Sequence, residues 1–227
     1  MIFALALAAT LAAPAASATP AALLAPDVVL ARYAKALAAV KEPSVLSLEY
    51  RLEQTGGRSL DQTHRIYRTT TLERDETLSV DAKRLTPPTV RIYRGKRNRY
   101  TVAALAPRPD QYDYTYLGPR KDAHHVDYVF RLTPKAARAF AITELAIDGI
   151  KFLPRRVVFR TSTNGGSGAV QFAGTGRWWI PLNAIAQAKL GRQMYAERLT
   201  FGAYRFPTSL PSSTFSVPKP LPTTTIP

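Results

Sequence analysis

The chain contains no cysteine among its 227 residues. Disulfides, thiolate nucleophiles, iron–sulfur clusters, Cys-ligated zinc and the acylated cysteine of bacterial lipoproteins are therefore all impossible. Hydrophobic residues still make up 46% of the chain, which is typical of a globular protein and excludes a wholly disordered one. A chain of this length can bury a sizeable core without covalent or metal cross-links.

Residues that carry catalysis or metal binding are also scarce. There are three histidines, and the adjacent pair His124 and His125 would point to opposite faces of a strand, so solvated or loop histidines are expected rather than a metal site. No G-x-S-x-G nucleophile motif occurs, and the glycine-rich stretch 164–168 lacks the Lys-Ser/Thr that a phosphate loop needs. The carboxylates at 73–76 indicate a solvated charged turn rather than a catalytic pair. The sequence therefore predicts no metal, no cofactor and no enzymatic activity.

Acidic residues are few relative to basic ones. The chain has 31 Lys+Arg against 16 Asp+Glu, a formal net charge of +15. This charge suits an anionic membrane surface or an acidic partner, and the absence of a nucleic-acid-binding motif argues against nucleic acid. Five bases cluster within nine residues, and we expect them to contact a headgroup or partner, or else to form a solvated hairpin tip that protects a sheet edge: Arg91, Arg94, Lys96, Arg97 and Arg99.

Long apolar runs are missing as well. Residues 2–11 are apolar but too short to span a bilayer, and no later stretch reaches the about 18 apolar residues that a span requires. Pro14 and the Ala16-Ser17-Ala18 pattern follow, which favours a signal peptide at 1–18 over a buried Ala-rich helix. The sequence thus predicts an exported protein that is soluble after cleavage, with a domain at 19–216 and a Pro-rich, disordered tail at 217–227.

One substantial helix is expected, over about residues 27–40. Val29, Tyr33, Leu37 and Val40 recur on one face, and Asp27 is a plausible N-cap. This amphipathic pattern predicts a helix that packs against a sheet.

Strands dominate the rest of the chain. Residues 46–52 alternate apolar and polar side chains, and Asp148-Gly149 between two strand patterns predicts a hairpin. A second hairpin is expected around 95–98, with a break at Pro87-Pro88, a turn at Gly118-Pro119 and a short helical turn within 135–140. The pattern predicts an α+β fold with a large curved antiparallel sheet, an unclosed β-barrel, and one or a few helices as a lid.

A single helix of about 14 residues cannot cover so large a sheet. Either the sheet closes on itself, or some apolar face stays available for a hydrophobic ligand. The aromatic residues at alternate positions fit both an ordinary core and the lining of a ligand cavity. The candidate cavity residues are Val29, Tyr33, Leu37, Leu48, Tyr50, Tyr114, Tyr116, Tyr128 and Phe130.

Several segments resemble a known family. Ile142-Thr-Glu-Leu-Ala-Ile-Asp-Gly-Ile-Lys-Phe-Leu-Pro154, followed by Arg155-Arg-Val-Val-Phe159, resembles the hairpin of the LolA-like superfamily of periplasmic lipoprotein carriers. The stretches Trp178–Pro181, Glu197–Phe206 and Leu210–Phe215 resemble the C-terminal part of such domains. The resemblance covers about residues 26–216 and implies an unclosed β-barrel with a helical lid over an apolar cavity.

Together these patterns predict an exported, non-enzymatic binder or carrier of an acyl-chain ligand in the bacterial envelope. The expected partners are a lipid or an acylated protein, and an anionic membrane surface is a further candidate. The alternative is an envelope regulatory or protein-interaction module that uses the same fold without carrying a ligand.

Overall fold

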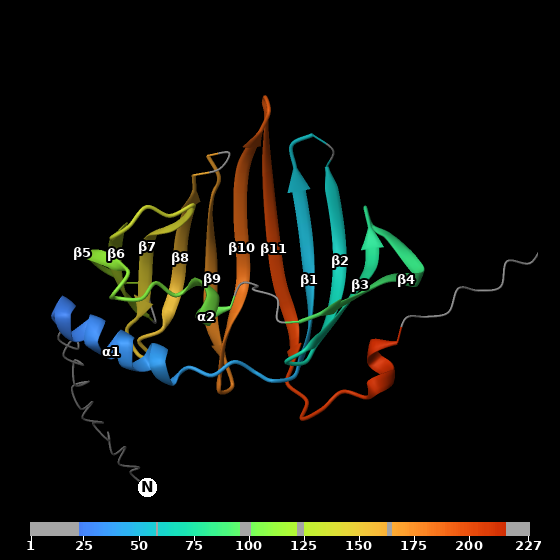
Figure 1. The fold of residues 1–227 in the computed structure, drawn as a ribbon, viewed down its shortest axis with the longest axis horizontal. Coiled ribbons are helices and arrows are strands. Elements are labelled where there is room, and N and C mark those ends of the chain that lie inside the picture. Colours follow the sequence, from blue (N-terminus) through green and yellow to red (C-terminus); the bar gives the residue numbers. More distant parts are fainter. Residues whose placement is uncertain (1–22, 58, 96–100, 122–124, 163–164, 217–227) are drawn as a thin grey trace, which may run out of the picture.

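The computed structural model describes residues 23–57, 59–95, 101–121, 125–162 and 165–216. The predicted signal peptide at 1–18 and the predicted tail at 217–227 lie outside these residues. Within them, the chain forms one antiparallel sheet of eleven strands with a long helix on one face (Figure 1). The predicted α+β fold with a large, unclosed antiparallel sheet is therefore confirmed.

The strand order is β4-β3-β2-β1-β11-β10-β9-β8-β7-β6-β5, so β4 and β5 are the two free edges. The chain runs outward from β1 to β4, crosses the sheet to β5, and returns strand by strand until β11 pairs with β1. The strands are β1 (Leu46–Thr55), β2 (Leu60–Arg68), β3 (Leu72–Val80), β4 (Lys83–Arg94), β5 (Tyr112–Lys121), β6 (Val126–Pro134), β7 (Phe140–Asp148), β8 (Pro154–Thr161), β9 (Ser167–Thr175), β10 (Trp178–Leu190) and β11 (Gln193–Arg205). Three helical segments complete the fold: α1 (Pro26–Ala39), α2 (Val102–Leu105) and the 3-10 turn η1 (Ser212–Phe215).

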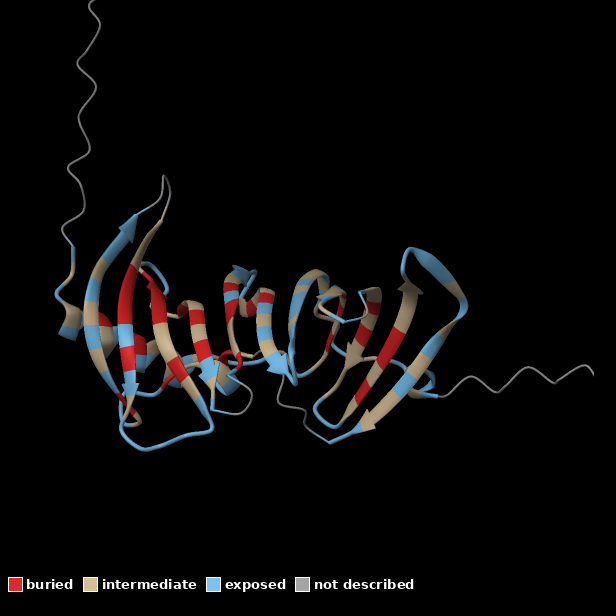
Figure 2. Cartoon of the chain, turned by 90° about the horizontal axis from the view of Figure 1, so that it is seen from above, coloured by how far each residue is buried: buried red, intermediate tan, exposed pale blue. Residues whose placement is uncertain are grey.

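The main core lies between α1 and the β5–β9 part of the sheet. We call the face that α1 covers the inner face and the opposite one the outer face. One row of side chains on the inner face crosses seven strands in register: Leu199, Ala184, Val170, Val157, Leu145, Phe130 and Tyr116. Val29 and Tyr33 of α1 pack onto this surface and are fully buried. Buried segments recur along the strands of this part of the sheet (Figure 2). The predicted amphipathic helix is confirmed, because the residues of its apolar stripe contact the sheet.

Two predictions were wrong, one about the start of α1 and one about the connection between β6 and β7. Asp27 is not the N-cap: Ala25 holds that position without a side-chain hydrogen bond, and Asp27 lies in the first turn, where its charge suits the helix dipole. No helical turn forms at 135–139, since these residues connect β6 to β7 without a helical hydrogen-bond pattern.

The predicted breaks at prolines were also wrong, and for one reason. Pro87 and Pro88 lie inside β4, and Gly118-Pro119 lies inside β5. Both strands are sheet edges, where a residue without an N–H does not interrupt a ladder on its outer side. In β5 the register shifts between Tyr116 and Gly118, which accommodates the extra residue as a bulge.

The hairpin turn expected around 95–98 lies largely outside the described residues, and the return strand expected up to Leu105 is wrong, because residues 102–105 form α2. Thr101 caps this short helix, and its hydroxyl accepts a hydrogen bond from the Ala104 N–H at 3.2 Å. The hairpin at Asp148-Gly149 is confirmed by the pairing of β7 with β8.

Candidate functional site

The inner face holds a cavity of about 650 Å³ beside the covered core. It lies over β1, β2, β10 and β11, next to α2, on the part of the sheet that α1 does not reach (Figure 1). Its walls are mainly apolar and aromatic: Leu46, Leu48, Tyr50, Ile66, Trp179, Ile180, Leu199, Phe201 and Tyr204. The cavity therefore offers an apolar ligand a surface that α1 does not cover.

Strand periodicity explains why these side chains converge. Leu46, Leu48 and Tyr50 occupy alternate positions of β1 and so share the inner face. Tyr50 lies opposite Phe201 of β11, and Leu48 lies opposite Ile66 of β2. These residues form a second buried cluster, which meets the main core through Leu199 and Phe201. The cavity wall is thus continuous with the packed interior.

Polar groups gather at one end of the cavity. Arg68 and Glu73 line it together, and the Arg68 Nε donates to the Glu73 carboxylate at 2.8 Å. Thr69 and Thr70 of the β2–β3 turn, next to Arg68 in the chain, complete this polar end, and Glu42 after α1 also lines the cavity. A ligand with one polar and one apolar end would therefore meet both kinds of surface in a single site.

A buried polar network lies beside the cavity wall, on the same face of the sheet. The His64 ring stacks on Tyr50 with centroids 4.6 Å apart, and its Nδ1 lies 2.8 Å from an Asp75 carboxylate oxygen. Its Nε2 lies 3.1 Å from the Gln62 side-chain oxygen, and the Tyr50 hydroxyl donates to Asp75 at 3.5 Å. Both ring nitrogens of His64 are thus within hydrogen-bond distance of side chains of the sheet, and the stacked ring holds Tyr50 in place.

This network overturns two expectations from the sequence. His64 is not solvated, and the carboxylates of residues 73–76 do not form an exposed turn: Glu73, Asp75 and Glu76 are buried in β3. The turn lies earlier, at 69–71, so the acidic residues fall inside the sheet. Arg68, His64 and Arg74 lie against them and compensate for the burial of charge.

The predicted cavity residues divide into two groups. Leu48 and Tyr50 line the cavity, and their contact with a ligand stays a prediction. The others pack in or against the main core under α1 and do not line it: Val29, Tyr33, Leu37, Tyr114, Tyr116, Tyr128 and Phe130. The sequence pattern identified the inner face correctly but not which part of that face α1 covers. The cavity residues from β10 and β11, such as Trp179 and Phe201, were missed, although Phe201 lies within the predicted last strand.

Burial also shifts the pKa of several tyrosine hydroxyls. It raises the pKa of the Tyr33 hydroxyl well above its ordinary value, and it raises the pKa of Tyr114 and of the cavity residue Tyr204 in the same direction. Tyr204 donates to the Pro181 carbonyl at 2.7 Å, which holds its ring against the cavity wall. These hydroxyls are therefore neutral hydrogen-bond donors at physiological pH.

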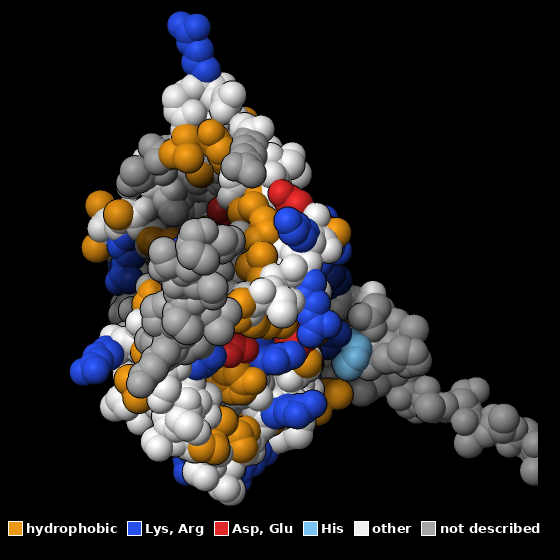
Figure 3. Space-filling view, turned by 90° about the vertical axis from the view of Figure 1, so that its right-hand side faces the viewer, with side chains coloured by type: hydrophobic (Ala, Val, Ile, Leu, Met, Phe, Trp, Pro, Cys, Tyr) orange, Lys and Arg blue, Asp and Glu red, His pale blue; other side chains and the backbone are white. Residues whose placement is uncertain are grey.

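The predicted basic cluster is only partly described by the structure. Arg91 and Arg94 lie exposed on the edge strand β4 and do not line the cavity, whereas Lys96, Arg97 and Arg99 lie outside the described residues. Figure 3, which views the molecule from the β4 side, shows lysine and arginine side chains spread over this face with few acidic ones. Contact of these residues with a headgroup or partner stays a prediction.

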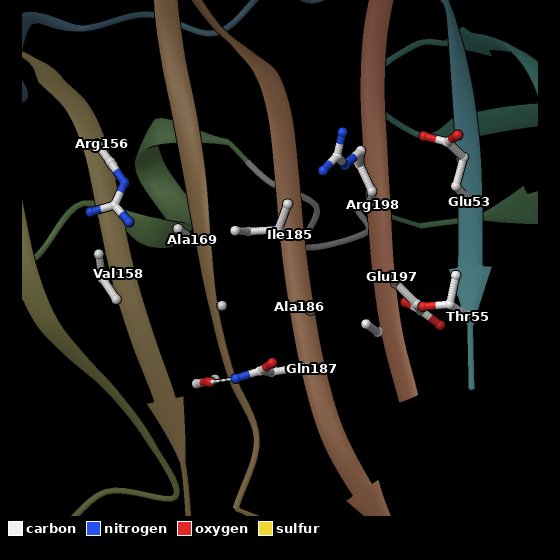
Figure 4. A pocket seen from close by; sticks show the side chains of 13 residues that line it. Glu53, Thr55, Arg156, Val158, Ala169, Ile185, Ala186, Gln187, Glu197 and Arg198 are labelled. Atoms are coloured by element: carbon white, nitrogen blue, oxygen red, sulfur yellow. Dashed lines mark hydrogen bonds between the residues drawn. The ribbon is translucent and has the colours of Figure 1, made fainter. Parts of the chain in front are cut away.

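The outer face has a second, shallower hollow of about 540 Å³ (Figure 4). Its lining includes small residues such as Ala169 and Ala196. Ile185 projects into it, and Arg156, Arg198 and Glu53 flank it. Its mixture of charges and its small apolar area make it a weaker ligand site than the inner cavity.

Metal and membrane-spanning features are absent from the part of the chain that the structure describes. There, no three His, Asp or Glu side chains come close enough together to hold a metal ion. No described helix is long and apolar enough to cross a membrane.

Comparisons with known proteins find similarity in structure and not in sequence. No family model and no curated protein matches the chain. A LolA superfamily protein from Nitrosomonas europaea matches at 11% identity, covering 86% of this chain and 99% of its own, with a TM-score of 0.45. A DUF1329 family protein from Desulfovibrio piger matches at 11% identity, covering 84% and 96%, with a TM-score of 0.47.

A third solved structure is described as an outer membrane lipoprotein-sorting protein domain, from Vibrio parahaemolyticus. It matches at 13% identity, covers 82% of this chain and 95% of its own, and has a TM-score of 0.45. The solved structures that this chain resembles thus include LolA-like proteins. These likenesses concern the fold alone, so the function is argued from the chain's own cavity.

Proposed function

We propose that this chain is an exported, non-enzymatic binder of a ligand with an acyl chain, held in the inner-face cavity. The observation that carries the proposal is the cavity of about 650 Å³ beside the packed core. Its apolar wall is built by β1, β10 and β11. Ligand sites in proteins are typically mainly apolar clefts of about 300–1,000 Å³ with a few polar groups. The cavity fits this description in size and in chemistry.

The energetic argument follows from burial. Each methylene group that leaves water for an apolar wall contributes about 0.8 kcal/mol, so even part of a chain gives a substantial binding energy. Arg68, Glu73 and the two threonines at the polar end would orient the ligand's polar group. The remaining parts of the proposal are cleavage after Ala18 and a single ligand-binding domain at 19–216.

The direct test is native mass spectrometry of the protein purified from the exported fraction, followed by organic extraction. A bound mass that extracts as a lipid supports the proposal and identifies the ligand class. An empty protein that takes up neither added fatty acid nor phospholipid contradicts it and favours the alternative, an envelope interaction module.

A matched pair of variants locates the site. Leu199→Trp places an indole into the cavity, whereas Leu182→Trp adds the same group at an exposed position of β10 that does not line it. We expect the first variant to lose binding of a fluorescent fatty acid at least tenfold and the second to bind as the wild type does. Circular dichroism checks that both fold. Equal binding by the two variants would place the ligand elsewhere.

A further inference from the structure

The β10–β11 hairpin projects beyond the rest of the sheet. Its two strands pair with each other as far as Leu190 and Gln193. The pairing of β10 with β9 stops at Gln187, and that of β11 with β1 stops at Ala196. Among the described residues, no third strand pairs with 188–195. At about 3.3 Å per residue, the tip extends about 10 Å past the strands beside it (Figure 1).

The tip is supported at its base. A side chain at Gly56, in the β1–β2 turn, would collide with the Met194 carbonyl oxygen, and one at Gly57 would meet the Tyr195 ring. The turn therefore packs closely against the β11 side of the hairpin. Gly191 has φ +62°, which lets the chain reverse in the two-residue loop between Leu190 and Gln193. The projection is a defined structural element with a support on one side.

The composition of the tip combines apolar and basic side chains. Leu190 is 51% exposed and Met194 53%, although both are large hydrophobic residues. Lys189 and Arg192 are exposed beside them. No acidic residue occurs between Gln187 and Ala196. A hairpin that only needed to stay soluble would not place two large apolar side chains at its most exposed end.

The register puts the two apolar side chains on opposite faces. Leu190 pairs with Gln193, and Lys189 pairs with Met194, so Leu190 points to the side of the inner face and Met194 to the side of the outer face. A flat protein partner would cover only one of these faces. The interfacial region of a bilayer surrounds an inserted tip on every side and can accept both residues at once.

We propose that the β10–β11 tip docks on an anionic lipid bilayer. Leu190 and Met194 enter the interfacial region, while the charged ends of Lys189 and Arg192 reach the phosphate groups and their aliphatic stems lie along the apolar part. The net charge of +15 brings the whole molecule toward an anionic surface. The same charges disfavour a second copy as the occupant, since two tips would bring four basic side chains together without an acid.

This docking site is separate from the ligand cavity. Trp179 and Ile180, which line the cavity, are at the opposite end of β10 from Leu190. Changes at the tip should therefore leave binding of a fatty acid in the cavity unchanged. Failure of either proposal can be distinguished from failure of the other.

The test is vesicle flotation with the full chain. Vesicles of phosphatidylcholine alone are compared with vesicles of phosphatidylcholine and phosphatidylglycerol in equal parts. We expect binding to the anionic vesicles that weakens as salt rises. Lys189→Gln with Arg192→Gln should weaken it about 30-fold, since each basic residue near the surface contributes about a factor of five. Lys83→Gln with Arg84→Gln, which changes the net charge equally at the exposed start of β4, should have a much smaller effect.

The apolar contribution has its own variants. Leu190→Ser with Met194→Ser should release the protein from anionic vesicles, whereas Leu182→Ser, at an exposed position of the same strand β10, should not. Leu190→Trp adds a reporter whose fluorescence should shift to the blue on anionic vesicles. Absence of vesicle binding by the wild type, or equal losses in the tip variants and their controls, would overturn the proposal. Binding of the wild type to anionic vesicles would also fail to support the proposal if the fluorescence of the Leu190→Trp variant did not shift to the blue on the same vesicles, and that result would overturn it.

Discussion

Tyr33 and Tyr114 donate hydrogen bonds to the same acceptor, the carbonyl oxygen of Pro107, at 2.8 and 2.9 Å. Tyr33 belongs to α1 and Tyr114 to the edge strand β5, and Pro107 lies in the segment that connects α2 to β5. A single carbonyl thus joins the covering helix, the sheet edge and the crossing connection. This shared bond explains why the aromatic residues near it are packed core rather than an open ligand surface.

The shared acceptor predicts non-additive losses of stability. In Tyr33→Phe or Tyr114→Phe alone, the Pro107 carbonyl keeps one donor, and each change should cost about 1 kcal/mol of the free energy of unfolding. The double variant leaves the carbonyl without either donor and should cost more than the sum of the two. Urea denaturation of the four proteins forms the double-mutant cycle. Additive losses would show that the carbonyl finds another donor.

Alkaline pH should destabilise the protein. Burial raises the pKa of Tyr33, Tyr114 and Tyr204 above the ordinary value of 10.0, so the folded state keeps protons that the unfolded state releases. The contribution of these tyrosines to the free energy of unfolding should therefore be constant below about pH 10 and fall above it, by up to about 1.4 kcal/mol per pH unit for each tyrosine. Urea denaturation across this range measures the slope, and an ultraviolet titration follows phenolate formation. The Tyr33→Phe, Tyr114→Phe double variant should have a shallower slope, and an unchanged slope would contradict the assignment.

Two strand glycines should respond oppositely to alanine. A Cβ on Gly168 would press into the Phe159 ring and the backbone of Ile185, so Gly168→Ala should lower the free energy of unfolding by about 1–3 kcal/mol. A Cβ on Gly202 meets nothing within 4 Å, and this glycine has no positive φ, so Gly202→Ala should be neutral or stabilising by up to about 1 kcal/mol. Thermal or urea unfolding compares them. If Gly202→Ala lowered the free energy of unfolding as much as Gly168→Ala, backbone freedom rather than the space for a Cβ would decide the effect at both positions.

Much of the fold could be predicted because it follows from local periodicity. The 3.6-residue spacing of Val29, Tyr33 and Leu37 predicted α1, and the alternation in residues 46–52 predicted β1 and its buried face. Asp148-Gly149 predicted the β7–β8 hairpin, since these residue types favour a tight turn. Of the residues proposed from the sequence as a ligand site, Leu48 and Tyr50 line the inner-face cavity, and a ligand there stays a prediction.

The wrong predictions share a cause, because each depended on where its segment lies in the sheet. Pro87 and Pro88 indicate a break when considered locally, yet an edge strand tolerates them. Glu73 and Asp75 indicate a solvated turn, yet Arg68 and His64 reach them from the neighbouring strand and allow their burial. These partners are near in the sequence, but they meet only because the turn falls at 69–71 and pairs β2 with β3, and the sequence pattern had placed the turn at the carboxylates themselves.

The sequence by itself determined the charge of the molecule, the absence of thiol chemistry, the one long helix and the alternating strands, because these depend on composition and on neighbouring residues. Only the tertiary structure decided what covers each apolar face. A period-two pattern shows that Phe130 and Leu48 each have a buried side, but the cover over that side comes from elsewhere in the chain. Since α1 lies over β5–β9, Phe130 became core and Leu48 became the wall of a cavity.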